Sequence, residues 1–439
     1  MTARRILAAG WLLFMLFAFP GYLTTESLDQ LMDARVDQFT DWYAPVMSWI
    51  WRLIGHLIAG PAGMLALQSL LFLAGAFGLL RRALPDRAAA LATCGVLLFP
   101  PITTVLAVIW RDGQLAGFIL AGAAAVASDR RGWRIAGLAL LIIGATMRDG
   151  ATIAALPIVV ALFWWRADVV GWRRAAIAAA AWVAVVAGAT GLDRGLADAE
   201  TERPALTLAR LDVLGVVRFA ETTSDADLHA ELARAGLAGA VPDDVHHQVR
   251  ILYKYPERHA ELLALPAKDD PSGRAALLRA RRELAWAHPR AYVWHRGRQL
   301  RLALGLEPSE RWTPIYTSFT EKPAQRLIVH QRATHSAAQQ LLIDAVEETP
   351  AVLFRPYLYA ALALLLLPLA IIRRQRDALA LLASGLAYEA SLFVTVVTPE
   401  YRHSHWLITC TVIGAVMLAA RELSSRAARR ARPAAAPVG

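Results

Sequence analysis

Residues 62–80 read AGMLALQSLLFLAGAFGLL and contain no charged side chain. A helix of this length spans about 29 Å, close to the thickness of the hydrocarbon layer of a bilayer. Two arginines, Arg81 and Arg82, follow the apolar run directly. An uncharged run of this length that ends in cations is typical of a transmembrane helix that ends at the cytoplasmic surface.

The rest of the 439-residue chain repeats this pattern. Hydrophobic residues make up 56% of the sequence and charged residues 19%, whereas soluble domains have about 25% charged residues. Comparable apolar runs lie at 6–23, 62–80, 88–109, 113–127, 133–147, 150–165, 173–191, 351–372, 378–397 and 405–421. The sequence therefore predicts an all-α polytopic membrane helical bundle of about ten spans.

The arginines predict how these spans are oriented. If the N-terminus is cytoplasmic, the segments on the cytoplasmic side of the ten spans hold nineteen arginines. The short loops on the external side hold only five. Because cytoplasmic segments are enriched in cations, both termini are expected in the cytoplasm of a bacterial inner membrane. Residues 192–350 carry 21 basic and 22 acidic groups, so the rest of the chain carries a net charge of +11 and the positive excess belongs to the membrane part. This distribution indicates a lipid bilayer as partner and argues against nucleic acid.

The spans divide the chain into four parts. Residues 1–191 are expected to form a transmembrane module of seven spans, whose first external loop covers 24–61. Residues 192–350 are expected to form a mostly helical extracytoplasmic domain, since 275–286 and 291–304 repeat apolar positions every three or four residues. Residues 351–421 would supply three more spans, and the Ala-, Arg- and Pro-rich stretch 422–439 would be a disordered cytoplasmic tail.

The first external loop is unusually acidic. Residues 24–45 read TTESLDQLMDARVDQFTDWYAP. Glu26, Asp29 and Asp33 have a spacing that places them on one face of a helix. Close like charges raise the pKa of a carboxylate, and a carboxylate poised near neutrality can accept a proton from a hydroxyl group. The alternative is an acidic helix that is only solvated at the bilayer surface.

Three further external connections carry one arginine each. They read Trp110-Arg111-Asp112-Gly113, Arg148-Asp149-Gly150 and Pro399-Glu400-Tyr401-Arg402-His403-Ser404-His405. The planar guanidinium matches phosphate oxygens, so three converging arginines would bind an anionic headgroup or lipid phosphate. In the alternative interpretation, the Arg-Asp pairs only end helices and pair with each other, and His403 and His405 are interface histidines instead of metal ligands.

These motifs together resemble the GT-C superfamily of integral-membrane glycosyltransferases. Bacterial members carry a first external loop of the form Asp-Ser, then Gln, then Ser-Asp-Trp-His-Pro-Pro. The corresponding residues here are Glu26-Ser27, Gln30 and Thr40-Asp41-Trp42-Tyr43-Ala44-Pro45. The Trp110-Arg111-Asp112, Arg148-Asp149-Gly150 and Glu400-Tyr401-Arg402 motifs add to the similarity, which covers most of the membrane portion.

The resemblance implies an inverting enzyme that moves a sugar from a polyprenyl-phosphate donor to an acceptor outside the cell. Glu26 would be the base, although the family residue is Asp, and Asp41 is the second choice. Arg111, Arg148 and Arg402 would hold the donor phosphate. Residues expected to support the site or contact substrate are Asp29, Gln30, Trp42, Tyr43, Asp112, Asp149, Glu400, Tyr401 and His403. Tyr43 and Ala44 replace the family's His and first Pro.

Cofactors and substrates are defined only in part. No Gly-rich phosphate loop occurs, and no cofactor is expected; a divalent metal held by the acidic loop is the alternative. The acceptor is a glycan, a lipid or a protein. Two other functions fit the same layout: a transporter or flippase for a lipid-linked or anionic solute, and a non-catalytic envelope assembly protein. A transporter would be expected to carry charged residues near the middle of its spans.

Overall fold

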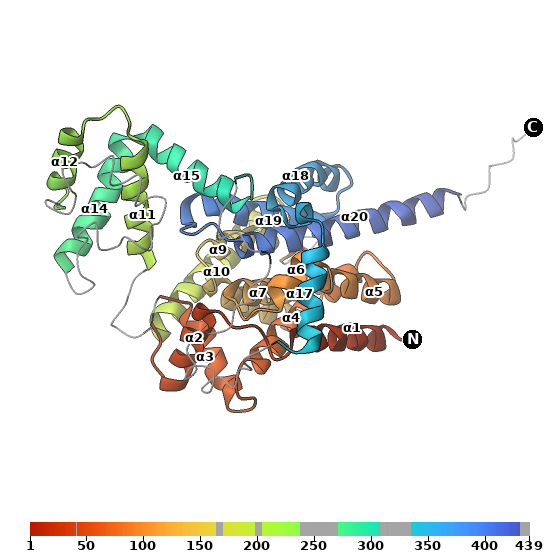
Figure 1. Ribbon diagram of the computed structural model, residues 1–439. Helices are drawn as coiled ribbons and strands as arrows, with labels where there is room; N and C mark the ends of the chain where they lie inside the picture. The colour runs from red at the N-terminus through yellow and green to blue at the C-terminus, as the bar shows by residue number, and fades with distance from the viewer. Residues whose placement is uncertain are drawn as a thin grey trace, which may run out of the picture.

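The computed structural model describes residues 1–40, 42–163, 170–197, 204–237, 271–307, 314 and 335–430. Over these residues the chain forms eighteen α-helices and two short 3-10 helices, with no strand (Figure 1). The only extended pairing described there is a single bridge between Tyr22 and Val108. The predicted all-α class is therefore confirmed.

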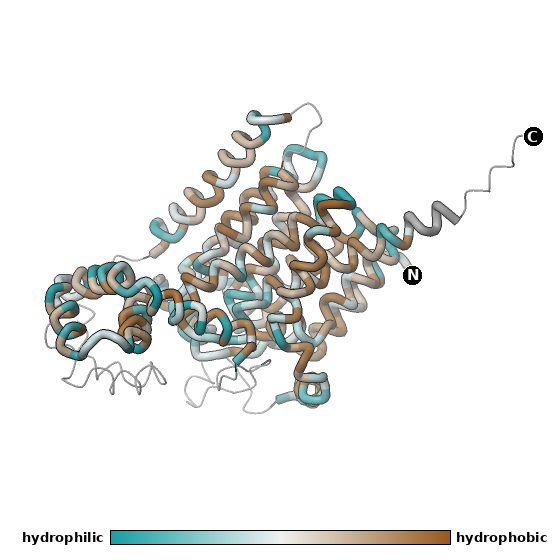
Figure 2. Tube along the Cα trace, turned by 90° about the horizontal axis from the view of Figure 1, so that it is seen from above, coloured by the Kyte–Doolittle hydropathy of each residue, from teal (hydrophilic) through white to brown (hydrophobic). Residues whose placement is uncertain are grey.

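Several helices are long and apolar enough to cross a membrane. Four of them qualify within the described residues: α4 (Ala62–Leu80), α10 (Gly171–Leu196), α19 (Arg376–Thr395) and the segment Tyr401–Ser424, which contains most of α20 (His405–Arg430). Two shorter apolar helices are α9 (Ala151–Leu162) and α18 (Pro356–Ile372). Figure 2 shows hydrophobic residues along the helices of one bundle. These features are compatible with a multi-pass membrane protein.

The predicted span over 88–109 is not one straight helix. The chain instead forms α5 (Asp86–Leu97) and α6 (Pro100–Leu106), whose axes differ in direction by 69°. Pro100 and Pro101 have no backbone N–H to donate, and a proline disfavours helical backbone in the residue before it. Phe99 accordingly adopts extended backbone, with φ −68° and ψ 120°. The two prolines thus explain the broken helix.

Helix α7 (Arg111–Val126) lies at the centre of the bundle, between α4 and α8 (Arg131–Thr146), and is buried along nearly its whole length. Small residues let the backbones approach closely. A Cβ atom at Gly75 of α4 would lie 2.4 Å from the backbone nitrogen of Ala121, and one at Gly137 of α8 would lie 2.6 Å from that of Val126. The close approach of α4, α7 and α8 therefore depends on glycine.

One end of the bundle is rich in arginine. Helix α1 (Ala3–Ala18) begins there with Arg4 and Arg5, α4 ends there before Arg81 and Arg82, and α20 leaves the bundle at the same end (Figure 1). The Arg82 Nε atom lies 2.8 Å from an Asp377 carboxylate oxygen at the start of α19. The opposite end is formed by the ends of α1, α8 and α19 and the starts of α7, α9 and α20.

The described part of 192–350 is also helical, as predicted. It contains α11 (Pro204–Phe219), α12 (Asp225–Arg234), α14 (Pro271–Ala287), α15 (Pro289–Ala303) and α17 (Ala337–Glu348). Helices α11, α12 and α14 share a small apolar core that is separate from the core of the bundle. Helix α15 leads from this cluster to α19, whereas α17 packs against α1 (Figure 1).

A buried ion pair connects the small cluster to the bundle. Asp212 of α11 pairs with Arg296 of α15, and both side chains are fully buried. A second nitrogen of Arg296 donates a hydrogen bond of 2.9 Å to the carbonyl of Val396, directly after α19. Arg281 of α14 donates to the same carboxylate at 2.6 Å. Asp212 is thus shared by cations from two helices.

Replacing Gly75 with leucine should separate α4 from α7. We expect Gly75→Leu to lower the free energy of unfolding by about 2 kcal/mol, because the added side chain meets helix backbone that cannot move aside. The measurement is the Tm of the detergent-solubilised protein. Gly95→Leu is the control, since Gly95 is exposed on α5 and a Cβ there meets no atom within 4 Å. An equal Tm for the two variants would contradict the tight α4–α7 contact.

Candidate functional site

The start of helix α2 (Thr25–Val36) is fastened to the segment that precedes α7. Thr24 caps α2 by accepting a 3.2 Å hydrogen bond from the backbone N–H of Ser27, whose hydroxyl also lies 3.0 Å from the Thr24 hydroxyl. The Ser27 hydroxyl donates to the carbonyl of Ile109 at 2.5 Å, and the Trp110 indole donates to Thr24 at 3.2 Å. These bonds fix the first turn of α2 beside the first turn of α7.

Glu26 of that first turn is held between two arginines. Its Oε1 accepts a 2.5 Å hydrogen bond from Nε of Arg111, the first residue of α7. Its Oε2 accepts a 2.6 Å hydrogen bond from Arg402, in the 3-10 helix η2 (Tyr401–Ser404) before α20. The three side chains are only 11%, 19% and 10% exposed, respectively. The fold thus brings together residues that are 376 positions apart in sequence.

The third predicted arginine joins the same group through Asp112. Arg148 donates to both oxygens of the Asp112 carboxylate, at 2.9 and 2.7 Å, in a bidentate pair. Arg402 lies 3.8 Å from Asp112 and also donates to Glu400 at 2.5 Å. The group therefore contains three guanidinium and three carboxylate groups, and it lies at the end of the bundle opposite the arginine-rich end. We call these six residues the arginine–carboxylate cluster.

Two aromatic rings lie against the cluster. The Arg111 guanidinium is 5.4 Å from the centre of the Tyr43 ring, and that of Arg402 is 4.8 Å from the centre of the Trp110 ring. The Tyr43 hydroxyl donates to Asp29 at 3.1 Å, and Trp42 makes an edge contact with Tyr43. Such cation–π contacts fix the direction in which each guanidinium points.

The electrostatics of Glu26 differ from the prediction. Burial alone would raise the pKa of Glu26, but Arg111, Arg402 and Arg148 outweigh it and hold the pKa well below the ordinary glutamate value. The expectation of a carboxylate poised near neutrality by neighbouring acids is therefore wrong. The acids are close in sequence, whereas the nearest charges in space are cations. Burial would lower the pKa of Arg148, yet Asp112 raises it, so Arg148 is a permanent cation.

The alternative, in which the two Arg-Asp motifs pair with each other, holds for one of the two arginines. Arg148 pairs with Asp112 from the other motif, and Arg111 pairs with Glu26. Asp149 is exposed and takes part in none of the ion pairs described for the cluster. Asp41, the second choice for the base, lies outside the described residues. The cluster thus contains Glu26 and all three predicted arginines but does not include Asp149.

The remaining predicted residues surround the cluster. Gln30, one turn after Glu26, is fully buried, and neither polar atom of its amide has a partner among the described residues. Tyr401 is buried and donates to the carbonyl of Pro101 at 2.8 Å, so it anchors η2 to α6. His403 is buried, and its Nδ1 has no partner in the described part of the chain.

Glu389 was missed by the sequence analysis. It lies in α19, is 5% exposed, and accepts a 2.8 Å hydrogen bond from the Ser404 hydroxyl, next to the cluster's η2 segment. An acidic residue inside the apolar run 378–397 was the available signal, because an ionisable group in a span marks a functional position. Over the described residues, no group of three or more His, Cys, Asp or Glu side chains is arranged to hold a metal ion.

Comparisons with protein-family models, with curated proteins and with solved structures found no match to this chain. The assignment to the GT-C superfamily therefore stays a resemblance that rests on the short motifs quoted above.

The lowered pKa of Glu26 predicts how stability depends on pH. The two ion pairs contribute fully above the ordinary glutamate value of 4.5, and this contribution is lost as the pH falls below it toward the pKa of the folded state. At pH 7 we expect Glu26→Gln to lower the free energy of unfolding by about 3 kcal/mol, because two partly buried arginines lose their anion. The measurement is Tm against pH for both proteins.

The difference in Tm between wild type and Glu26→Gln should shrink from pH 7 to pH 3. Asp86→Asn is the control, since Asp86 is exposed at the opposite end of the bundle. A gap between wild type and Glu26→Gln that stays constant over this range would contradict an ionised, paired Glu26.

Proposed function

We propose that the chain is an integral-membrane glycosyltransferase that moves a sugar from a polyprenyl-phosphate donor to an acceptor outside the cell. The observation that supports this proposal best is the arginine–carboxylate cluster, in which Glu26 bridges Arg111 and Arg402 beside the Arg148–Asp112 pair. Guanidinium groups bind phosphate in the forked geometry in which Arg148 binds Asp112 here.

The proposed orientation places the cluster at the extracytoplasmic face of a bacterial inner membrane. Arg4, Arg5, Arg81 and Arg82 lie at the opposite end of the bundle, where cytoplasmic cations are expected. In this arrangement about ten helical segments cross or enter the bilayer, both termini are cytoplasmic, and residues 192–350 are extracytoplasmic. The shorter helices would reach across with the help of tilt and of shielding by their neighbours.

In the proposed mechanism, the donor phosphate displaces the Glu26 carboxylate from Arg111 and Arg402. Glu26 then stays buried but loses its cations, so its pKa rises and it becomes a stronger base. The charge of the site changes in the same direction. The six groups of the cluster sum to zero, so a bound phosphodiester leaves one excess negative charge, which strengthens the tendency of the ionised Glu26 to take the acceptor's proton.

The transfer step forms one bond, breaks one bond and moves one proton. The acceptor hydroxyl oxygen forms a bond to the anomeric carbon of the sugar, and the bond between that carbon and the phosphate oxygen breaks. The polyprenyl phosphate leaves with the bonding electron pair, and Glu26 takes the hydroxyl proton. Arg111, Arg402 and Arg148 stabilise the charge that develops on the leaving phosphate. Attack from the face opposite the phosphate would invert the anomeric centre, as the resemblance implies.

The acceptor site is less defined than the donor site. Gln30 lies one helical turn from Glu26 with both amide atoms unpartnered in the described residues, so it is the best candidate to bind a sugar hydroxyl. Tyr43 and Trp42 supply aromatic faces near Arg111. The acceptor class stays a glycan, a lipid or a protein.

A deletion strain tests the activity whichever sugar is transferred. We expect glycan and lipid analysis to show one missing sugar and an accumulated polyprenyl-phosphate sugar, both restored by the wild-type chain. Glu26→Gln should lower the rate of transfer by about 10²- to 10⁴-fold, because it removes the base. Glu26→Asp keeps the charge and should retain more activity than Glu26→Gln, and Asp86→Asn should transfer like wild type.

The outcomes separate the proposed enzyme from a scaffold. A Glu26→Gln protein that is abundant in the membrane and restores the missing sugar would refute the catalytic role of Glu26. If Glu26→Gln loses both the sugar and the protein, Arg402→Lys replaces it as the test, because lysine keeps the positive charge but not the planar guanidinium. That variant should lower transfer at normal abundance.

Glu389 favours the transporter as a second candidate function. It is a buried acid within an apolar helix, and one of its carboxylate oxygens has no partner among the described residues. Reconstitution in proteoliposomes distinguishes the two functions. An enzyme consumes a labelled polyprenyl-phosphate sugar when acceptor is present, whereas a flippase changes the leaflet of the lipid and leaves it intact.

A further inference from the structure

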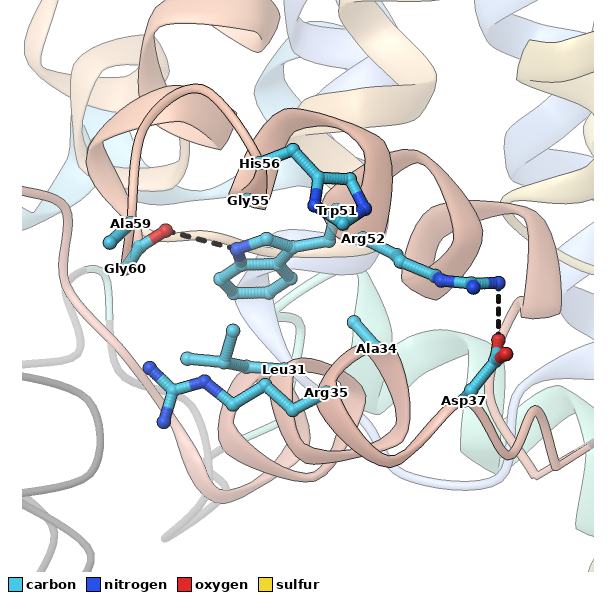
Figure 3. Close-up of a pocket in the computed structure, with 10 residues that line it drawn as sticks. All are labelled: Leu31, Ala34, Arg35, Asp37, Trp51, Arg52, Gly55, His56, Ala59 and Gly60. Carbon is cyan, nitrogen blue, oxygen red and sulfur yellow. Dashed lines mark hydrogen bonds and ion pairs between the residues drawn. The ribbon is translucent and has the colours of Figure 1, made fainter.

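A pocket of about 360 Å³ lies between α2 and α3 (Pro45–Gly55), on the last turns of both helices. Leu31 and Ala34 of α2 and Trp51 of α3 form its apolar wall, and Gly60 closes one side. Gly60 has φ +79°, which favours glycine, and this turn brings its carbonyl within 3.0 Å of the Trp51 indole N–H (Figure 3). The pocket is therefore built on fixed helices and a fixed turn.

The polar side chains of this pocket are mostly basic. Arg35, Arg52 and His56 line it together with one acidic residue, Asp37. Figure 3 shows Arg52 paired with Asp37, whereas Arg35 extends alongside the pocket below Trp51. Arg35 is exposed, and no ion pair joins it to any residue that the structure describes. An anion in this pocket would thus find a cation that is not already neutralised there.

An apolar stripe runs beside the pocket. Trp49, Leu53 and Leu57 follow one another at intervals of four residues and are 37%, 47% and 87% exposed, and Ile58 next to them is 47% exposed. Arg52 and His56, the pocket residues, each lie one residue before a member of this stripe. Exposed apolar side chains at helical spacing next to basic ones are typical of a helix that lies in a membrane interface.

We propose that this pocket binds the phosphate headgroup of an anionic phospholipid, while the acyl chains lie along Trp49, Leu53 and Leu57. The combination of features selects this class of ligand. The basic rim attracts an anion, the apolar wall and stripe suit attached hydrocarbon, and the two are close in sequence along α3 and the turn that follows it. A soluble phosphate would use the rim but leave the stripe uncovered.

The phospholipid site is distinct from the arginine–carboxylate cluster. Arg35 follows Glu26 by nine residues on the same helix, which corresponds to about 14 Å along the helix axis. The two sites share no lining residue. A lipid bound at the last turn of α2 would hold that helix against the bilayer, with Glu26 at its other end. The proposal does not depend on the reaction proposed for the cluster.

Native mass spectrometry of the purified full-length protein tests this site. The probes are phosphatidylglycerol and phosphatidylcholine with the same acyl chains, added to the delipidated protein in detergent. We expect phosphatidylglycerol to bind more tightly, and Arg35→Gln to weaken it about fivefold, which corresponds to about 1 kcal/mol for one cation near a lipid phosphate. Arg35→Lys should restore most of the binding, since the charge is kept.

Two controls and one competing ligand define the outcome. Arg131→Gln removes an exposed arginine at the other end of the bundle and should leave phosphatidylglycerol binding unchanged. Leu53→Gln should weaken the binding of phosphatidylglycerol because it interrupts the apolar stripe. Glycerol phosphate should not displace the lipid at concentrations at which phosphatidylglycerol itself saturates the protein. Equal binding of the two lipids, or equal losses in Arg35→Gln and Arg131→Gln at unchanged Tm, would overturn the proposal.

Discussion

Three guanidinium groups are almost buried at one end of this helix bundle, and the neutralisation of their charge is the constraint on which the rest depends. A buried cation without an anion costs several kcal/mol, so Arg111, Arg148 and Arg402 require carboxylates close by. Glu26, Asp112 and Glu400 meet this need and come from three segments that are far apart in sequence. The packing of α2, α7 and η2 against one another is thereby tied to electrostatics as well as to apolar burial.

In the proposed reaction the same pairing would give the site two electrostatic states. In the structure Glu26 is an internal ligand of Arg111 and Arg402, so the arginines are saturated and the carboxylate is a weak base. In the proposed reaction an incoming phosphate would reverse both properties at once, because it would satisfy the arginines and leave Glu26 buried without a cation. Catalytic basicity in the proposed reaction is thus a consequence of donor binding, and Glu26 paired with its arginines has little capacity to activate water.

The sequence predicted the helical class and the members of the site better than it predicted their partners. Apolar runs are a local signal, and they identified α4, α10, α19 and α20 directly. Pro100-Pro101 is a local signal for the break between α5 and α6, and Thr24 and Ser27 are a local signal for the cap of α2. Pairing between the two Arg-Asp motifs was one of the alternatives, but the pairing of Glu26 with Arg111 and Arg402 could not be predicted, because it depends on how α2, α7 and η2 pack. The predicted rise in the pKa of Glu26 was wrong for the same reason, since its cations come from segments distant in sequence.

Arg296 connects the small cluster of α11, α12 and α14 to the helix bundle, which limits how the chain can be divided into fragments. Its guanidinium is fully buried, its anion comes from α11, and its other hydrogen bond goes to Val396, six residues before Arg402. Removing α11 from the chain would leave this buried cation without its anion, beside the helices of the bundle. The cluster of α11, α12 and α14 therefore cannot be exchanged independently of the bundle. A chimera that exchanges this cluster must keep Asp212 and Arg296 together.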